Sequence, residues 1–144
     1  VIRYAKHIGA SDERLYRALL VSDLVTIHQK TGIGRLSAYC GAVSAGCGAG
    51  AGIAYLLGGD YRAIAHTIVN DGAKPSCAAK IASAVEAGIL GYYMYVNDQQ
   101  FRGGDGIVAK GVENTIRNVG LLASQGMKQT DRVILNIMTG DQCL

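Results

Sequence analysis

The sequence predicts an all-α protein, a compact bundle of about six helices around a central helix that is rich in glycine and alanine. Two observations predict this class. Apolar residues recur at helical spacing in several segments, and no segment shows the apolar–polar alternation of a half-buried strand. With 144 residues, 49% of them hydrophobic and 17% charged, the chain is long enough to form one domain with a core.

The first helix is predicted from its two ends. Ser11 is a favourable N-cap, two acidic residues follow it, and the TGIG stretch at 31–34 ends the helix. Between these ends apolar side chains recur at helical spacing: Leu15, Leu19, Leu20, Leu24 and Ile27.

Further helices are expected from the same kinds of signal. They cover about 36–57, 61–69, 76–95, 112–125 and 130–140. Pro75 and the N-cap residue Ser76 mark the start of the one at 76–95. The GGDG stretch at 103–106 lacks the preceding strand and the Lys-Ser/Thr pair of a phosphate-binding P-loop, so its glycines are interpreted as turn or packing residues.

The central helix has no charged residue from 36 to 59. That length would cross a bilayer, so a membrane helix is an alternative interpretation. However, glycine, alanine and serine provide little insertion energy, and no basic flank or aromatic belt frames the segment. We therefore expect a buried helix, packed closely by its neighbours because its side chains are small, and no membrane partner.

Charge and cysteine content limit the possible functions. The net charge is +3, but Lys and Arg are scattered along the sequence without a basic cluster, so we expect no nucleic-acid partner. The first residues, VIRYAKHIGASDER, lack the apolar segment and cleavage site of a signal peptide, and they lack an initiating Met. Four cysteines without a CxxC pattern then predict reduced thiols in a cytoplasmic protein, of which this chain is a piece.

Cysteines are the residues that suggest chemistry. Cys40 and Cys47 share one face of the central helix, where the two thiols are either metal ligands or small core residues. Cys77 falls in the first turn of a helix, among unpaired backbone N–H groups that favour a thiolate. It can be a nucleophile, a metal ligand or a buried side chain. His28 or His66 could act as a base, or each could be structural.

Four blocks of the sequence together resemble one protein family. They are RLSAYCGAVSAGCGAGAG (35–52), DGAKPSCAAKIASA (71–84), GGDGIVAKGVENTIRNVG (103–120) and MKQTDRVILNIM (127–138). In order and spacing they resemble the C-terminal part of the UPF0597 proteins, the L-cysteine desulfidase family, which is similar to the alpha domain of iron–sulfur L-serine dehydratases. The resemblance implies that residues 1–144 form a helical domain and that the N-terminal half of the family is absent here.

The resemblance also implies a cofactor. Members of the family are thought to hold a [4Fe–4S] cluster through three cysteines, which leaves one iron open to a small amino-acid substrate. Cys40 matches one ligand. The second family ligand directly precedes DGA, where this chain has Asn70, and about ten residues ending in Val-Cys are missing between Asn70 and Asp71. The third ligand belongs to a motif in the N-terminal half.

The turn from Asp71 to Ser76 is expected to shape the substrate site. Cys77 matches a second cysteine of the family and is a further candidate metal ligand. Asp71, Gly72 and Ser76 are candidate substrate-binding residues, because backbone N–H groups at a helix start suit a carboxylate. Cys47 is interpreted as a core residue, since members of the family carry methionine there.

We therefore predict the C-terminal portion of an iron–sulfur-dependent β-eliminating lyase. It is an L-cysteine desulfidase, converting cysteine to sulfide, pyruvate and ammonia, or an enzyme similar to L-serine dehydratase. Its expected partners are a small amino-acid substrate and the N-terminal part of the same protein, and a homo-oligomer is left open. This chain alone is expected to be inactive. The alternative is a non-catalytic helical module that serves assembly or regulation.

Overall fold

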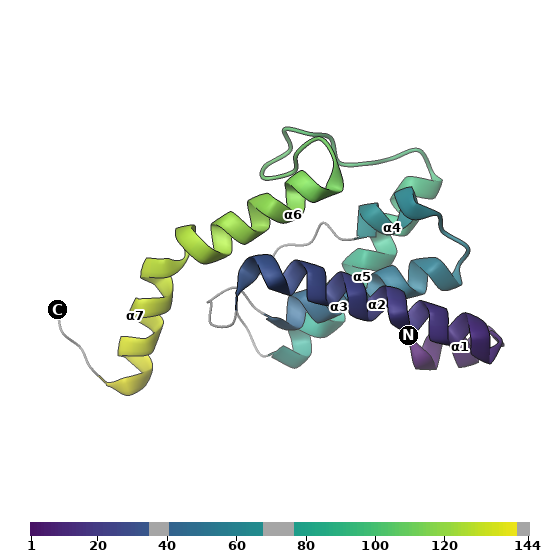
Figure 1. Cartoon of the computed structure of the whole chain (residues 1–144), viewed down its shortest axis with the longest axis horizontal. Helices are drawn as coiled ribbons and strands as arrows, with labels where there is room; N and C mark the ends of the chain where they lie inside the picture. Colours follow the sequence, from purple (N-terminus) through teal and green to yellow (C-terminus); the bar gives the residue numbers. More distant parts are fainter. Residues whose placement is uncertain (35–40, 68–76, 141–144) are drawn as a thin grey trace.

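A computed structural model describes residues 1–34, 41–67 and 77–140, apart from the side chains of 77–80. These ranges form α-helices and one π-helical turn and contain no strand, which confirms the all-α prediction (Figure 1). The helices are α1 (Ile2–His7), α2 (Asp12–Ile33), α3 (Gly41–Leu56), α4 (Tyr61–Thr67), α5 (Cys77–Val96), α6 (Val112–Leu121) and α7 (Lys128–Thr139), with the π-helix η1 (Leu122–Gly126) between the last two.

Helix α3 is the centre of the bundle, as predicted, and packs against α2 on one side and α5 on the other. Its glycines allow this close approach. A Cβ on Gly48 would collide with Thr26 of α2, and a Cβ on Gly46 would collide with Ala84 of α5. Larger side chains at these positions would hold the backbones apart, so the glycines determine how closely the three helices pack.

The uncharged stretch of the sequence is therefore used for packing between helices. Helix α3 has 16 residues, and eleven of them are buried. Within the ranges that the structure describes, no helix is both long and apolar enough to cross a membrane.

Helix α2 places small residues opposite the glycines of α3, with Ser22 beside Gly48 and Ala18 beside Gly52. Its buried residues are Ala18, Ser22, Gln29 and Ile33. Of the predicted apolar positions, Leu15 and Leu19 are half-buried, whereas Leu20, Leu24 and Ile27 are exposed. The helical spacing predicted the helix correctly, but it did not indicate which face meets α3, because glycine-mediated contact requires small residues on both helices.

Local signals place most of the helix ends. Ser11 Oγ accepts a hydrogen bond from Arg14 N at 3.3 Å, as expected for the N-cap of α2. Gly140 follows α7 in a left-handed conformation that suits glycine. The predicted starts at 36 and 76 lie outside the described residues. Three features were not predicted. The six-residue α1, which has no side-chain cap, was not expected at all. The helix predicted over 112–125 changes to the π-helix η1 after Leu121, and α7 begins at Lys128 instead of 130.

Helices α6 and α7 extend from the bundle as an arm. Helix α6 packs along α2, and the buried side chains of Ile33, Val119 and Ala123 join α2 to α6 and η1. Helix α7 lies beyond η1, away from α3 and α5 (Figure 1). None of its residues is buried, although Val133 and Ile137 are apolar. The apolar side chains of α7 therefore lack a core to pack against in the part of the chain that the structure describes.

The contact between Gly46 and Ala84 predicts a specific effect on stability. Replacing a helical glycine by alanine normally stabilises a helix by about 0.5–1 kcal/mol. Gly46→Ala should instead lower the free energy of unfolding by about 1–2 kcal/mol, because the new methyl group collides with Ala84 and separates α3 from α5. Urea unfolding of the purified protein measures this change.

A reciprocal variant provides the control. Ala84→Gly in the Gly46→Ala background moves the methyl group from one helix to the other, so it should recover part of the lost stability. If the effects of the two substitutions simply add, this contact does not determine the packing of α3 on α5.

Candidate functional site

Most of the predicted site residues lie outside the part that the structure describes. These are Cys40, Asp71, Gly72 and Ser76. Cys77 is the first residue of α5, which agrees with its predicted place at a helix start, but its side chain is not described. The geometry of the site is therefore built from the helices that flank these residues.

Helices α3 and α5 run side by side in the same direction. Gly46 lies against Ala84, and one turn further along both helices Gly50 lies against Gly88, where a Cβ on Gly50 would be 3.1 Å from the Gly88 Cα. Because the contacting residues increase in residue number along both helices, the two helices are parallel. The start of α3 at Gly41 and the start of α5 therefore lie at the same end of the pair, next to the end of α2 (Figure 1).

This shared end favours negatively charged groups. The first N–H groups of each helix have no partner within the helix, and the helix dipole adds positive potential there. Neither α3 nor α5 has an acidic side chain in its first turn to occupy these N–H groups. A thiolate or a carboxylate placed at the two helix starts would therefore be stabilised by both helices.

Lys30 adds a positive charge at the same place. Helix α2 runs antiparallel to α3, so its last turns reach the start of α3, and Lys30 Nζ lies 3.7 Å from the position that a Cβ on Gly41 would take. A cavity of about 430 Å³ opens beside it, lined by Thr26, Ile27, Lys30, Thr31 and Gly34. Sequence reasoning missed Lys30, because a lysine in the last turn of a helix is also common as a simple partner of the helix dipole.

Cys47 is a core residue, as predicted, and does not fit the role of a metal ligand. Its side chain is fully buried in α3, and this burial raises the pKa of the thiol to about 11, although a contact with Gln29 partly opposes the shift. The thiol stays protonated at neutral pH, whereas metal binding requires a thiolate. Among the described residues, no three His, Cys, Asp or Glu side chains are grouped so that they could hold a metal ion.

The two candidate bases lie away from the shared helix end. His28 Nε2 is 2.9 Å from Glu113 Oε2 in an exposed pair that links α2 to α6. His66 stacks on Tyr95, with ring centroids 5.2 Å apart, and its backbone lies against Gly91. Gly91 is roughly 20 Å along α5 from the helix start, at about 1.5 Å per residue. His66 is therefore too far from the helix starts to remove a proton from a substrate bound there, and His28 is directed toward α6 by its contact with Glu113.

The loop between α5 and α6 is a turn structure, as interpreted from the sequence. Asp105 Oδ2 accepts a hydrogen bond from Arg102 N at 2.7 Å, and Gly104 N donates to Val108 O at 2.9 Å. Gly104 and Gly106 both have positive φ, at 108° and 60°, which explains why this turn uses glycine. Asp105 thus orders the loop.

Comparison with known proteins identifies relatives over the whole chain. A family model described as "Serine dehydratase alpha chain" matches residues 1–136. A UPF0597 protein of Desulfitobacterium hafniense is 65% identical over 153 residues, covering 99% of this chain. UPF0597 proteins of Lachnoclostridium phytofermentans and Treponema denticola are 51% and 49% identical, over 96% and 98% of the chain.

These matches cover only part of each relative. The chain spans about a third of their length, 35% of the Desulfitobacterium protein and 36% of the Lachnoclostridium protein. No solved structure matches the chain. The family match over nearly all of its residues, together with the high identity to these relatives, confirms the resemblance noted in the sequence: the chain belongs to the serine dehydratase alpha chain family.

Proposed function

We propose that this chain is the cluster-binding, C-terminal part of an iron–sulfur-dependent β-eliminating lyase that acts on L-cysteine or L-serine. The observation that supports this most is the shared end of α3 and α5, because Cys77 begins one helix and Cys40 directly precedes the other. Membership in the serine dehydratase alpha chain family supports the same reaction class.

Cys40 is proposed to hold a [4Fe–4S] cluster as one of three ligands, and Cys77 is proposed as the ligand that takes the place of the family cysteine missing before Asp71. Unpaired N–H groups at the helix starts would stabilise both thiolates. A bound cluster with one open iron would supply a Lewis acid for a substrate carboxylate and its leaving group. The chain itself supplies positive potential from the two helix starts and from Lys30, which would hold the carboxylate of an amino acid beside them.

The segment that precedes α5 is proposed to complete the substrate site. Asp71, Gly72 and Ser76 belong to the segment that leads into Cys77, so their backbone is tied to the start of α5. Backbone N–H groups of this segment would donate hydrogen bonds to the carboxylate of a substrate.

The remaining cluster ligands are proposed to lie outside this chain. The match to the Desulfitobacterium relative extends over 153 aligned residues, more than the 144 residues of this chain, so that relative has residues without a counterpart here. We infer that these include the segment expected between Asn70 and Asp71, which ends in a ligand cysteine in the family. Without that cysteine and the N-terminal motif, this chain alone would not be active.

Cluster binding can be tested on the full-length protein. Anaerobic reconstitution with iron and sulfide should give a brown protein with the broad visible absorbance of an iron–sulfur cluster. Cys40→Ala and Cys77→Ala should each remove most of the bound iron, because each deletes a proposed ligand. Cys47→Ala is the matched control and should retain the colour, since its buried thiol is protonated.

Two results would contradict this assignment. A full-length protein that stays colourless would favour the non-catalytic helical module. Equal iron loss in all three variants would mean that the substitutions act through folding. For a protein that binds the cluster, sulfide release from L-cysteine and pyruvate release from L-serine then identify the preferred substrate.

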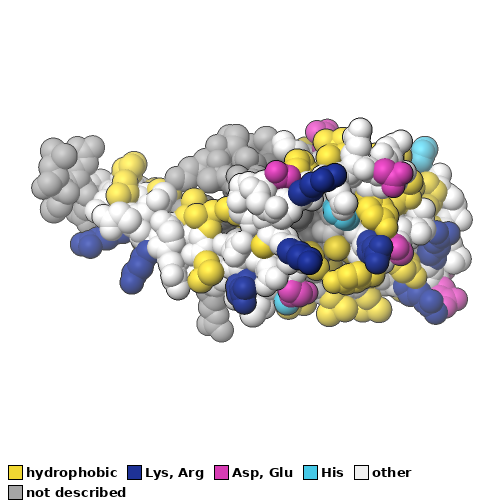
Figure 2. Space-filling model, turned by 90° about the horizontal axis from the view of Figure 1, so that it is seen from above, with side chains coloured by type: hydrophobic (Ala, Val, Ile, Leu, Met, Phe, Trp, Pro, Cys, Tyr) yellow, Lys and Arg dark blue, Asp and Glu magenta, His cyan; other side chains and the backbone are white. Residues whose placement is uncertain are grey.

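The rest of the full-length protein is the proposed partner of this chain. Helix α2 exposes four large side chains at helical spacing, Tyr16, Leu20, Leu24 and Ile27, each at least 60% exposed; we call this set the α2 stripe. An apolar groove of about 390 Å³ between α2, α4 and α6 continues from Leu24. Figure 2 shows hydrophobic side chains gathered at the edge of the face seen from above.

An exposed apolar surface of this kind is typical of an interface. The relatives are almost three times as long as this chain, so most of the full-length protein is available to cover the α2 stripe. We infer that it does so, with the side chain of Leu24 buried at the contact. The exposed apolar residues of α7 fit the same explanation.

Neighbouring positions on α2 offer a matched test. In the full-length protein, Leu24→Gln should lower the free energy of unfolding by about 2 kcal/mol, because it places an amide in an apolar contact. Asp23→Gln introduces the same side chain at an exposed polar position and should change stability by less than about 0.5 kcal/mol. Urea unfolding measures both variants.

A second copy of the protein is the competing partner. If Leu24→Gln separates an oligomer without lowering the stability of the protomer, the α2 stripe binds another copy, and the inference is wrong. Equal effects of the two variants would also contradict it.

A further inference from the structure

A second cavity lies at the other end of α5, outside the site proposed for the reaction. It is about 430 Å³ in volume and is formed by α4, the loop after α5 and the start of α6. Because α4 lies against Gly91 of α5, this cavity is on the order of 20 Å along α5 from the starts of α3 and α5. Cys47, the cysteine whose side chain the structure describes, does not line it.

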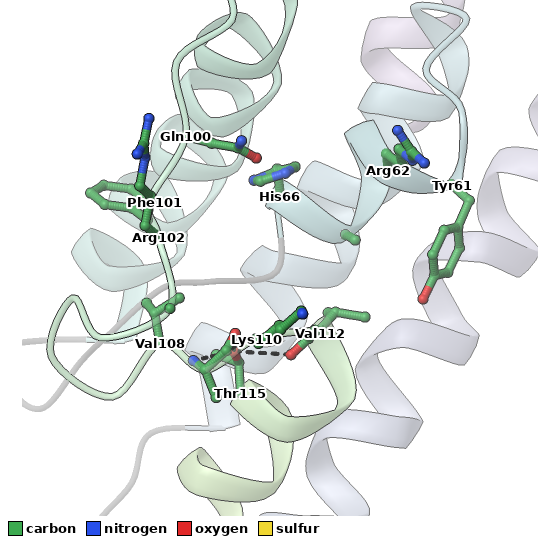
Figure 3. Close-up of a pocket in the computed structure, with 14 residues that line it drawn as sticks. Tyr61, Arg62, His66, Gln100, Phe101, Arg102, Val108, Lys110, Val112 and Thr115 are labelled. Atoms are coloured by element: carbon green, nitrogen blue, oxygen red, sulfur yellow. Dashed lines mark hydrogen bonds between the residues drawn. The ribbon is translucent and has the colours of Figure 1, made fainter.

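The charged side chains that line the described part of this cavity are all basic: Arg62, Arg102 and Lys110, with His66 beside them. Arg62 and Arg102 stand on opposite sides of the opening, with His66 between them (Figure 3). The space-filling view shows Lys and Arg side chains around a hollow on this face (Figure 2). These residues are far apart in the sequence, so the expectation that the chain has no basic cluster holds for the sequence but not for the fold.

Two carboxylates that are neighbours of lining residues in the sequence accept hydrogen bonds from backbone N–H groups. Asp60 Oδ1 accepts a hydrogen bond from Ala63 N at 2.9 Å and caps α4, and Asp105 Oδ2 accepts one from Arg102 N at 2.7 Å. Within the described residues, no salt bridge involves Arg62, Arg102 or Lys110. The cavity therefore has excess positive charge and no acidic residue in its described lining, which favours an anion and disfavours a metal ion.

The walls of the cavity are held in place without a ligand. Asn114 Nδ2 donates to Lys110 O at 2.8 Å, and Thr115 Oγ1, which is buried, accepts from Ala109 N at 3.0 Å. Gly103 packs directly on Lys110, since a Cβ there would lie 3.0 Å from Lys110 N. A loop fixed in this way loses little conformational freedom when a ligand binds.

We propose that this cavity binds a small organic or inorganic anion with a carboxylate or phosphate group. Arg62 and Lys110 contact the charged group, and the apolar wall formed by Phe101 and Val112 contacts the rest of an organic ligand. A cavity of about 430 Å³ is of the size that binds a small metabolite. This site is independent of the proposed lyase reaction, because it shares no residue with the helix starts.

Direct binding measurements on the full-length protein test the proposal. Isothermal titration with citrate, pyruvate and inorganic phosphate separates carboxylate ligands from phosphate ligands. At least one probe should bind, and its affinity should fall as sodium chloride is added. Arg62→Ala and Lys110→Ala should each weaken that binding roughly ten-fold, because each removes a charge-assisted hydrogen bond.

Two control variants distinguish a site from general attraction to a basic protein. Lys128→Ala removes an exposed positive charge on α7, outside the cavity, and should leave the affinity unchanged. Arg62→Lys keeps the charge and should retain part of the affinity. The proposal is overturned if none of the probes binds, or if Lys128→Ala weakens binding as much as Lys110→Ala does. Neither of these two results depends on the iron–sulfur cluster, so they test the anion site without testing the proposed lyase reaction.

Discussion

The glycines at the contact positions of α3 are the constraint on which the rest of the structure depends. Glycine at 46 and 48 lets the α3 backbone approach α5 on one side and α2 on the other. Contact of this kind is specific, because a Cβ at either position collides with a named neighbour. The packing fixes the register of α3 against α5, and the register in turn places the starts of the two helices together.

This arrangement explains why a core helix can also serve a site. A helix buried by large side chains would be separated from its neighbours by their thickness, and the polar ends of the helices would lie further apart. Here the backbones nearly touch at Gly50 and Gly88, so the two helix starts act on the same small volume. The contact between Gly50 and Gly88 is required for packing. Because it also brings the two helix starts together, it produces the positive potential at their shared end.

The sequence predicted what depends on local interactions. The N-cap Ser11 and the C-terminal Gly140 act within a few residues of their own helices, so both ends were assigned correctly. The apolar spacing of α2 identified a helix but not its buried face. Leu20 and Leu24 are exposed because the inner face of α2 must be small, and that requirement comes from α3, a separate segment of the chain.

The candidate site was predictable to a similar extent. The position of Cys77 at a helix start was inferred from Pro75 and Ser76, its neighbours in the sequence, and Cys77 is the first described residue of α5. Lys30 could not be found in this way. Its position beside Gly41 depends on the antiparallel packing of α2 on α3, and a row of glycines is compatible with several registers of the two helices.

The distribution of charge shows most clearly what folding adds to the sequence. Arg62, Arg102 and Lys110 are spread over nearly fifty positions in a chain with a net charge of only +3, so no window of the sequence is strongly basic. Folding brings them together because α4 packs on α5 near the point where α5 ends and the next loop begins.

Positive potential is thus concentrated at both ends of α5, from helix starts at one end and from side chains at the other. These two sources differ in chemistry. Backbone N–H groups carry a fixed partial positive charge and suit a ligand held against the helix, whereas long charged side chains can adjust to anions of different shape.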